Sequence, residues 1–188
     1  MNDTLKTIQN RYSCRSFSDR MPPEADLAAI ANAGLAAPSG MNKQPWFLSV
    51  VKNRALISEM EQEGLAVIAA GEERSVYKRL TARWGKLFFD APCMIMIAIK
   101  ESEFPQGAHL IDLGIVAQNI VLAAASLGID SLHCGLTAFC FAGDRAAEFK
   151  ARLQFPEGFE PGYAVLAGYA NERRAPHAIN PQKVAVIE

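Results

Sequence analysis

The segment 107–128, GAHLIDLGIVAQNIVLAAASLG, constrains the fold of this chain more than any other part of it. Its length predicts one long helix, and Gly128 suits the left-handed position that follows a helix. Its apolar residues do not form one stripe but point in every direction around the helix axis. A helix without a polar face is either buried on all sides or inserted in a membrane.

Two features of this segment argue against a membrane span. Gln118 and Asn119 lie side by side in its middle, and Asp112 and Asp130 flank it, whereas membrane spans carry few polar residues. A single small domain can hardly surround such a helix, so we expect a homodimer with the helix at or near its centre. Small residues along the helix would let neighbouring backbones approach closely: Gly114, Ala117, Ala123, Ala124 and Ala125.

Composition narrows the class of protein. The chain has 188 residues, half of them hydrophobic, and a net charge of −1, which indicates one domain with a core and no nucleic-acid partner. The N-terminal sequence MNDTLKTIQN lacks the apolar core of a signal peptide. The four cysteines show neither a CxxC motif nor a paired spacing. These features favour a cytoplasmic protein with reduced thiols and without a zinc site.

Hydrophobic periodicity predicts helices and strands that are mixed along the chain, which indicates an α+β fold with a modest sheet covered by helices. The expected strands are 46–51, 93–99 and 162–168, and residues 131–136 are expected to form a short strand or an extended segment. Besides the long helix, we expect a first helix capped by Asp3 or Thr4, a second that Pro22 and Pro23 open, and a last one capped by Asp144. Two further helices are expected, over 54–70 with a possible break at Gly64 and over about 73–89. In the first helix, Leu5 and Ile8 would face inward.

The C-terminal residues 170–188 contain two prolines and no helical period, and they hold the alternation VAV near their end. A compact domain has little use for such a tail. We therefore divide the chain into a domain of residues 1–169 and an arm of residues 170–188. We expect the arm to pack on the partner subunit, where it could add a strand to the partner's sheet.

Two polar segments in the first quarter of the chain could bind a ligand. Arg11, Ser13 and Arg15 place two guanidinium groups and a hydroxyl at a helix end, which suits a phosphate, although surface arginines at a turn would look the same. The loop 38–45 is bracketed by prolines and carries Ser39, among other polar groups. It could line the edge of a planar heterocycle or be an ordinary connection.

A third segment follows the long helix, and in it a strand at 131–136 would present backbone groups at the end of the core. His133 is open to two interpretations, a ligand or a structural histidine, and Cys134 is more often a packing residue than a nucleophile. The sequence has no Ser–His–Asp spacing, no G-x-G-x-x-G and no P-loop. If the chain is an enzyme, a bound cofactor therefore carries its chemistry, with no catalytic protein residue and no metal.

Five segments, in this order, resemble the flavin-dependent nitroreductase family: RYSCRSF, LAAPSGMNKQPWFLSVV, FFDAPCMIMIAI, IDLGIVAQNIVLAAASLGI and FPEGFEPGYAVLAGYA. The resemblance covers almost the whole chain. It implies a nitroreductase-like α+β fold, with a central, mostly antiparallel sheet covered by helices. It also implies an intertwined homodimer with a C-terminal arm, in which residues 1–169 bind FMN at the subunit interface.

The same resemblance implies which residues bind FMN. Arg11, Tyr12, Ser13 and Arg15 would hold the phosphate, the ribityl chain and the pyrimidine edge, and Tyr12 stands where the family more usually has Arg or His. The remaining implied residues belong to a loop from the other subunit, to the segment after the long helix and to the start of the tail: Pro38, Ser39, Gly40, Asn42, His133, Cys134, Gly135, Arg173 and Arg174.

The implied activity is the transfer of a hydride from NAD(P)H, through FMN, to a nitroaromatic, a quinone or a similar small-molecule acceptor. Arg15 would stabilise negative charge on the reduced flavin. Related flavin enzymes that resemble this chain saturate enones, dehalogenate tyrosines or cleave flavin, and residues 53–90 would decide the substrate. A non-catalytic protein that stores or senses FMN, and an FMN-free dimeric interaction module, are alternatives of other classes.

Overall fold

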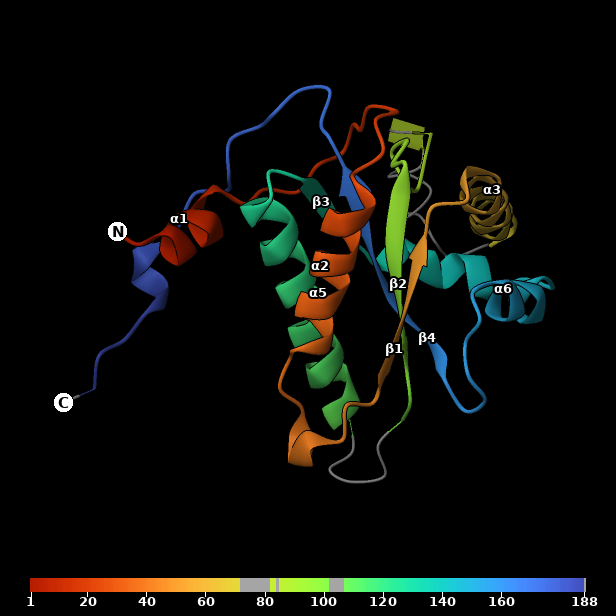
Figure 1. Cartoon of the computed structure of the whole chain (residues 1–188). Helices are drawn as coiled ribbons and strands as arrows, with labels where there is room; N and C mark the ends of the chain where they lie inside the picture. The colour runs from red at the N-terminus through yellow and green to blue at the C-terminus, as the bar shows by residue number, and fades with distance from the viewer. Residues whose placement is uncertain (72–81, 84, 102–106, 188) are drawn as a thin grey trace.

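The computed structural model describes residues 1–71, 82–83, 85–101 and 107–187. Within these residues, one sheet is formed by β1 (Trp46–Val51), β2 (Cys93–Ile99), β3 (Asp130–Cys134) and β4 (Glu160–Gly168). The strand order is β1-β2-β4-β3, and every neighbouring pair is antiparallel. Figure 1 shows this sheet between two helical layers, which confirms the predicted α+β fold.

The strand β2 explains why the sequence contains an uninterrupted apolar run. All seven of its residues are buried, because successive side chains point to opposite faces and both faces are covered. Ile95 and Ile97 belong to the core on one face of the sheet, and Met94 and Met96 belong to the core on the other. The sheet therefore separates two hydrophobic cores.

The helices α2 (Glu24–Leu35) and α5 (Ala108–Ser126) cover one face of the sheet. They pack closely, since a Cβ at Gly34 would lie 2.8 Å from Ile120 Cγ1. The Asn119 side chain donates a hydrogen bond from Nδ2 to the Ala33 carbonyl at 3.0 Å. As the sequence predicted, the chain leaves α5 through Gly128 in the left-handed region, at a φ of 72°.

The other face is covered by α3 (Arg54–Ala70), the 3-10 segment η2 (Gly135–Phe141) and α6 (Ala146–Arg152). The possible break in α3 at Gly64 is absent: the helix is continuous, and the glycine is needed for packing, because a Cβ there would lie 2.7 Å from Leu87 Cδ1. The expected cap of α6 at Asp144 is wrong, since Arg145 occupies the cap position, and its side chain makes no capping hydrogen bond to the helix backbone.

The predicted helix 73–89 is only partly testable, because residues 72–81 and 84 lie outside the described residues. The prediction is wrong for the C-terminal part of this helix. Residues 82–83 are helical, but the chain then enters a turn in which Phe89 and Asp90 have φ angles of 54° and 64°. The helical spacing of 73–89 put Leu87 and Phe88 on the inner side of this predicted helix; both are buried, although a turn and not a helix carries them.

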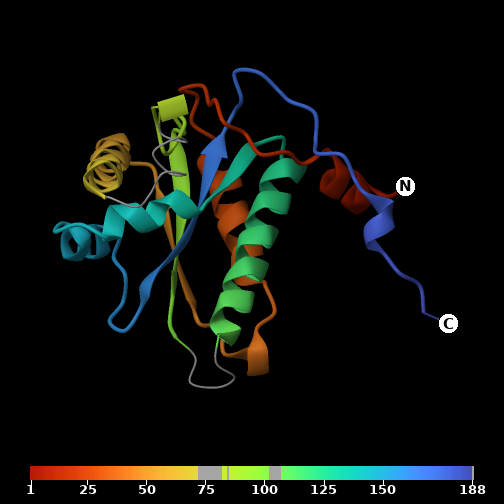
Figure 2. The same cartoon turned by 180° about the vertical axis from the view of Figure 1, so that it is seen from behind.

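The two ends of the chain lie together on one side of the molecule (Figures 1 and 2). The N-cap of α1 (Asp3–Asn10) is Asn2, whose side chain accepts a hydrogen bond from Leu5 N at 3.0 Å, so the expected cap at Asp3 or Thr4 is wrong. Leu5 and Ile8 are 50% and 46% exposed and do not face a core within this chain. Residues 171–187 are exposed throughout and include the short segment η3 (Pro181–Lys183).

The helix α5 is buried only on the side that faces the sheet and α2. On its outer side Leu110 and Ile111 are 61% and 69% exposed, so a single chain does not bury the helix all round. By length and composition alone, α5 could also cross a membrane. Its packing on the sheet and its polar contacts with neighbouring segments identify it as a core helix of this fold.

Candidate functional site

An isolated bridge joins two of the segments that the sequence singled out. Ser13 pairs with Ser131 in a parallel bridge, and Cys14 N donates a hydrogen bond to Ser131 O at 3.0 Å. Because Ser131 is the second residue of β3, this bridge sets the segment that contains Arg11 and Arg15 beside the start of the strand. The structure therefore brings together two of the expected groups of cofactor-binding residues.

These groups meet at a pocket of about 210 Å³ that is lined by Arg15, Phe89 and the segment 132–136. The segment contributes three expected residues, His133, Cys134 and Gly135. Phe89 was not predicted from the sequence, where it looked like part of a helix. Its position in the pocket depends on the turn after residue 85, which has no local sequence signal apart from Gly85, whose φ is 65°.

His133 lines this pocket from the strand β3. Its ring lies 5.7 Å from the ring of Tyr163, centroid to centroid. Burial first, and the positive charge of Arg11 second, lower the pKa of the imidazole below its ordinary value. At neutral pH the ring is therefore uncharged and can both donate and accept a hydrogen bond.

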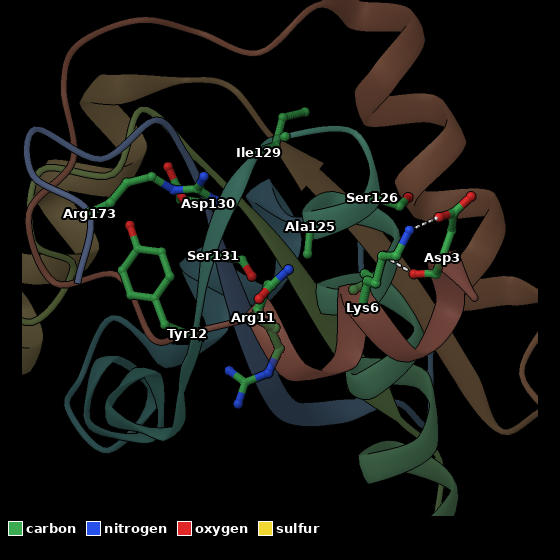
Figure 3. Close-up of a pocket in the computed structure, with 13 residues that line it drawn as sticks. Asp3, Lys6, Arg11, Tyr12, Ala125, Ser126, Ile129, Asp130, Ser131 and Arg173 are labelled. Atoms are coloured by element: carbon green, nitrogen blue, oxygen red, sulfur yellow. Dashed lines mark hydrogen bonds and ion pairs between the residues drawn. The ribbon is translucent and has the colours of Figure 1, made fainter. Parts of the chain in front are cut away.

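A second pocket of about 360 Å³ lies between α1, the end of α5 and the start of β3 (Figure 3). Asp130 organises it: Oδ2 accepts a hydrogen bond from Ala170 N at 2.9 Å, and Oδ1 lies 3.5 Å from an Arg173 nitrogen. The Arg173 guanidinium also lies 5.9 Å from the centroid of the Tyr12 ring. Arg173 is thus directed at Asp130, whereas Figure 3 shows the Arg11 side chain extending away from this cluster.

The hydroxyl of Tyr12 is buried and has no hydrogen bond of normal geometry among the described residues. Burial first, and the charge of Asp130 second, raise the pKa of this phenol above its ordinary value, so it remains a protonated donor. An unsatisfied buried hydroxyl costs roughly 1–3 kcal/mol. Tyr12 lines this second pocket with Arg11, Asp130 and Arg173, so its hydroxyl is a donor close to a carboxylate, whereas Arg15 lines the pocket at His133.

The loop 38–45 contains the 3-10 segment η1 (Gly40–Asn42), which lies by the start of α5, whereas β3 follows the other end of that helix (Figure 1). Gly40 N donates to Asp112 Oδ1 at 3.1 Å, near the start of the helix, whereas the pockets adjoin residues that follow Ser126. At about 1.5 Å per residue, α5 separates Asp112 from Ser126 by roughly 21 Å. The structure of one chain therefore does not bring Pro38, Ser39, Gly40 and Asn42 to the other expected residues.

The backbone of this loop is unusual, because three residues that are not glycine have positive φ angles: Met41 at 53°, Asn42 at 54° and Gln44 at 46°. Such conformations cost free energy and cluster at functional sites. Ser39 Oγ helps to hold the loop by accepting a hydrogen bond from Gln44 N at 2.8 Å. The loop is polar, exposed and fixed in shape.

The remaining expected residues are placed as follows. Arg174 is exposed on the segment after β4, and its charge acts on Cys14. Cys14 and Cys134 are 1% and 3% exposed, and burial raises the pKa of both thiols, that of Cys134 to about 11. Both cysteines are therefore protonated at neutral pH and poor nucleophiles.

Comparison with known proteins gives the family. The model of the nitroreductase family matches residues 8–169. A nitroreductase with bound FMN from Desulfitobacterium hafniense is 50% identical, with a TM-score of 0.94 and both chains covered completely. An Archaeoglobus fulgidus protein, provisionally named an NADH dehydrogenase/NAD(P)H nitroreductase, is 27% identical over 98% of this chain and 97% of its own. An iodotyrosine deiodinase of Haliscomenobacter hydrossis is 26% identical over 96% of this chain and 85% of its own. Because the family model spans most of the sequence and the fold agrees, this chain belongs to the nitroreductase family.

Proposed function

We propose that this chain is an FMN-dependent oxidoreductase that uses NAD(P)H to reduce a small organic acceptor such as a nitroaromatic or a quinone. The observation that carries the proposal is the Ser13–Ser131 bridge, which sets the segment of Arg11 and Arg15 beside β3; Arg15 lines the pocket at His133, and the charge of Arg11 acts on the imidazole. The 50% identity to an FMN-bound nitroreductase over the whole chain supports the choice of cofactor. The relative named for NAD(P)H supports the choice of reductant.

The residues present fit FMN. The phosphate and the pyrimidine carbonyls of FMN are acceptors, and Arg11, Ser13, Arg15 and the unsatisfied Tyr12 hydroxyl are donors on one short segment. When bound, FMN supplies the chemistry of the reaction by accepting a hydride and passing two electrons to an acceptor. We assign Arg11 to the phosphate end and Arg15 to the ring end, because Arg15 lines the pocket with Phe89 and His133.

The chain's own side chains then have simple tasks. Arg15 holds a permanent positive charge at the pocket, where it stabilises negative charge that develops on the ring. His133 is uncharged at neutral pH and offers a hydrogen bond without adding a second charge. Phe89 and the aliphatic side chains of Leu132 and Leu136 form apolar walls that exclude water and so strengthen these interactions.

We further propose that the active form is a homodimer, in which each site is completed by the loop 38–42 of the second copy. Within one chain this loop is about a helix length away from the pocket. The outer side of α5, with Leu110 and Ile111 exposed, is an apolar surface for that second copy. Packing two α5 helices in opposite directions would place the loop of each copy beside the pocket of the other.

We assign residues 170–188 to an arm that packs on the partner, and residues 1–169 to the FMN-binding domain. Among the described strands β1 is at an edge of the sheet, and a groove of about 420 Å³ runs along it and past Arg152, Leu153 and Gln154. Val184 and Val186 are 75% and 81% exposed on the tail, on the far side of α5 from β1 (Figures 1 and 2). A strand from the second copy would fill this edge.

A second candidate activity is the reductive removal of halogen from an aromatic amino acid. The observation that favours it is the likeness to the deiodinase, which extends over 96% of this chain. The same reduced cofactor serves both reactions, so the acceptor decides between them. In either case the four free cysteines, all buried, suit a reducing cytoplasm.

The proposal is tested by purifying the protein, identifying its pigment and mixing it with NADH and NADPH in a stopped-flow instrument. We expect FMN that is reduced rapidly by at least one nicotinamide and reoxidised by a nitroaromatic or a quinone. Faster reoxidation by a halotyrosine would favour the second candidate. Flavin that is bound but reduced only slowly by both nicotinamides would indicate a storage or sensor protein, and failure to bind FMN would refute the proposal.

A further inference from the structure

We propose that Glu61, which lies on α3 outside the pocket, is a positioning residue of the flavin site. Its carboxylate fixes the turn that carries Phe89 into the pocket wall. This inference rests on the proposed function, because it takes the pocket beside Arg15 and His133 as the place of the flavin ring. It adds a residue that the family resemblance does not supply.

The contact between Glu61 and the turn is a double hydrogen bond. Glu61 Oε1 accepts from Leu87 N and from Phe88 N, each at 2.6 Å. Bonds from backbone N–H groups to a carboxylate are charge-assisted and stronger than bonds between neutral groups. One side chain of α3 therefore fixes two successive peptide units of the turn.

The turn needs such an anchor, because its backbone is strained. Phe89 and Asp90 adopt positive φ angles of 54° and 64°, a region that residues with a side chain rarely occupy. Strained conformations persist only where the surroundings leave the chain no alternative. The two hydrogen bonds to Glu61 involve the residues immediately before Phe89 and Asp90, and they provide this restraint.

The turn is also joined to both segments that form the pocket. Phe17 N donates to Phe89 O at 3.1 Å, and Phe17 belongs to the segment that carries Arg15. Cys134 Sγ lies 3.7 Å from Leu87 O, and Cys134 ends β3. A displacement of the turn would therefore move the phenyl ring in the pocket and disturb both neighbouring walls.

An ion pair between Lys86 and Asp90 also spans the turn. Lys86 Nζ lies 2.5 Å and 2.6 Å from the two carboxylate oxygens of Asp90. Both side chains are about half exposed, and exposed ion pairs contribute little because water screens them. Glu61 is half-buried and binds backbone donors, so it and not the Lys86 pair should set the position of the turn.

The test compares three substitutions of Glu61 in the FMN-loaded protein. Glu61→Gln keeps a side-chain oxygen at the same reach, so its FMN dissociation constant should stay within about threefold of the original. Glu61→Leu removes the acceptor and Glu61→Asp shortens the side chain, so each should weaken FMN by about tenfold or more. The absorbance band of the bound flavin should shift in these two variants and not in Glu61→Gln, because the ring wall has moved.

Two controls separate positioning from general stability. Met60→Ala changes the neighbouring, fully buried residue of α3 and should lower the melting temperature without changing FMN affinity or the flavin spectrum. Lys86→Ala removes only the ion pair with Asp90 and should also leave the FMN affinity and the flavin spectrum unchanged. The inference is overturned if Met60→Ala weakens FMN as much as Glu61→Leu at an equal loss of melting temperature. If Glu61→Leu does not fold, Glu61→Asp decides, and a variant with the original affinity and spectrum overturns the inference.

Arg15→Ala, measured in parallel, shows which idea has failed. If Arg15→Ala weakens FMN while Glu61→Asp and Glu61→Leu do not, the pocket is the flavin site and only the role of Glu61 is wrong. If Arg15→Ala leaves FMN affinity unchanged, the flavin lies elsewhere, and the inference falls together with the site on which it rests.

Discussion

The carboxylate of Asp112 accepts a hydrogen bond from the backbone N–H of Gly40 at 3.1 Å, across 72 positions of sequence. Asp112 is 6% exposed near the start of α5, and Gly40 opens the strained loop that continues through Met41 and Asn42. This bond ties the loop to the helix at which we expect two chains to meet. A buried carboxylate without such a donor would be costly, so the pair holds each partner in place.

Asp112→Ala should therefore disturb the loop. Loss of the acceptor leaves Gly40 N without its partner, and we expect a stability loss of about 1–3 kcal/mol together with weaker FMN binding by the dimer. Asp112→Asn retains an acceptor and should largely restore both. Denaturant unfolding and FMN titration measure the two effects. Asn119→Ala, which loses the contact with Ala33 on the same helix, is the matched control and should spare FMN affinity.

The phosphate end of the site can be tested with two flavins that differ only in that group. Arg11→Ala should weaken FMN by roughly ten- to hundredfold more than riboflavin, since a charge-assisted contact contributes about 1.5–3 kcal/mol. Arg173→Ala, which loses the contact with Asp130, should show a smaller difference between the flavins. Equal losses for FMN and riboflavin in Arg11→Ala would show that Arg11 does not bind the phosphate.

The two cysteines beside the site should be dispensable for turnover. Burial raises the pKa of Cys14 and Cys134 and keeps both thiols protonated, and hydride transfer through a flavin requires no thiol. We expect the double variant Cys14→Ser, Cys134→Ala to keep its activity per bound FMN within about tenfold, which is ~1.4 kcal/mol in the barrier. A loss of several orders of magnitude with FMN still bound would establish a catalytic thiol.

The proposed dimer predicts what sedimentation will show. The full chain should sediment as a dimer at micromolar concentration, and deletion of residues 175–188 should weaken that dimer because the arm no longer reaches the partner. Ile111→Glu should also weaken it, since a charge would enter the apolar face of α5, where Ile111 is 69% exposed in the single chain. Gln62→Glu adds the same charge on the exposed side of α3, away from this face, and is the matched control that should leave the dimer unchanged. A folded monomer of the full chain would contradict the proposal.

Acid should weaken a surface ion-pair network that joins α3 to α6. Hydrogen bonds from Arg152 and Arg145 lower the pKa of Glu59 to about 2, and bonds from Arg145 and then Arg152 lower that of Glu148 to about 2. A carboxylate whose pKa is lowered in the folded state stabilises that state at pH values above the pKa of the unfolded state, near 4.5. This contribution is lost as the pH falls toward the folded-state pKa of about 2.

The measurement is the melting temperature of the original protein and of Glu59→Gln between pH 7 and pH 2. The original should melt at a higher temperature at pH 7, and the two curves should converge as the pH falls below 4.5. Because these side chains are exposed, the difference should be small and should shrink further in high salt. A difference that persists at pH 2 would assign the effect to packing and not to charge.

Local sequence patterns were sufficient for most of the elements. The apolar run of β2 and the all-round apolar character of α5 predicted a buried strand and a long helix, because side-chain periodicity follows directly from backbone geometry. The glycine at position 128 also predicted where α5 ends, because Gly128 adopts the left-handed conformation that glycine tolerates best. The site residues on 11–15 and 133–135 came from motif resemblance, and their roles stay a prediction, although Arg15 and the segment 133–135 line one pocket.

Other features depend on contacts between residues that are distant in sequence, and no local pattern encodes such contacts. Gly64 looked like a helix break, yet α3 continues through it because Leu87 packs against the bare backbone. Leu87 and Phe88 fitted a helical stripe, yet their backbone N–H groups donate hydrogen bonds to the Glu61 carboxylate, and the chain turns there. The resemblance assigned the loop at Gly40 to the flavin site of the other subunit, and only the tertiary structure shows that the length of α5 keeps this loop away from the Arg11 segment of its own chain. Periodicity reports which side of an element is apolar, whereas the hydrogen bonds that close a turn or a loop exist only after the layers have packed.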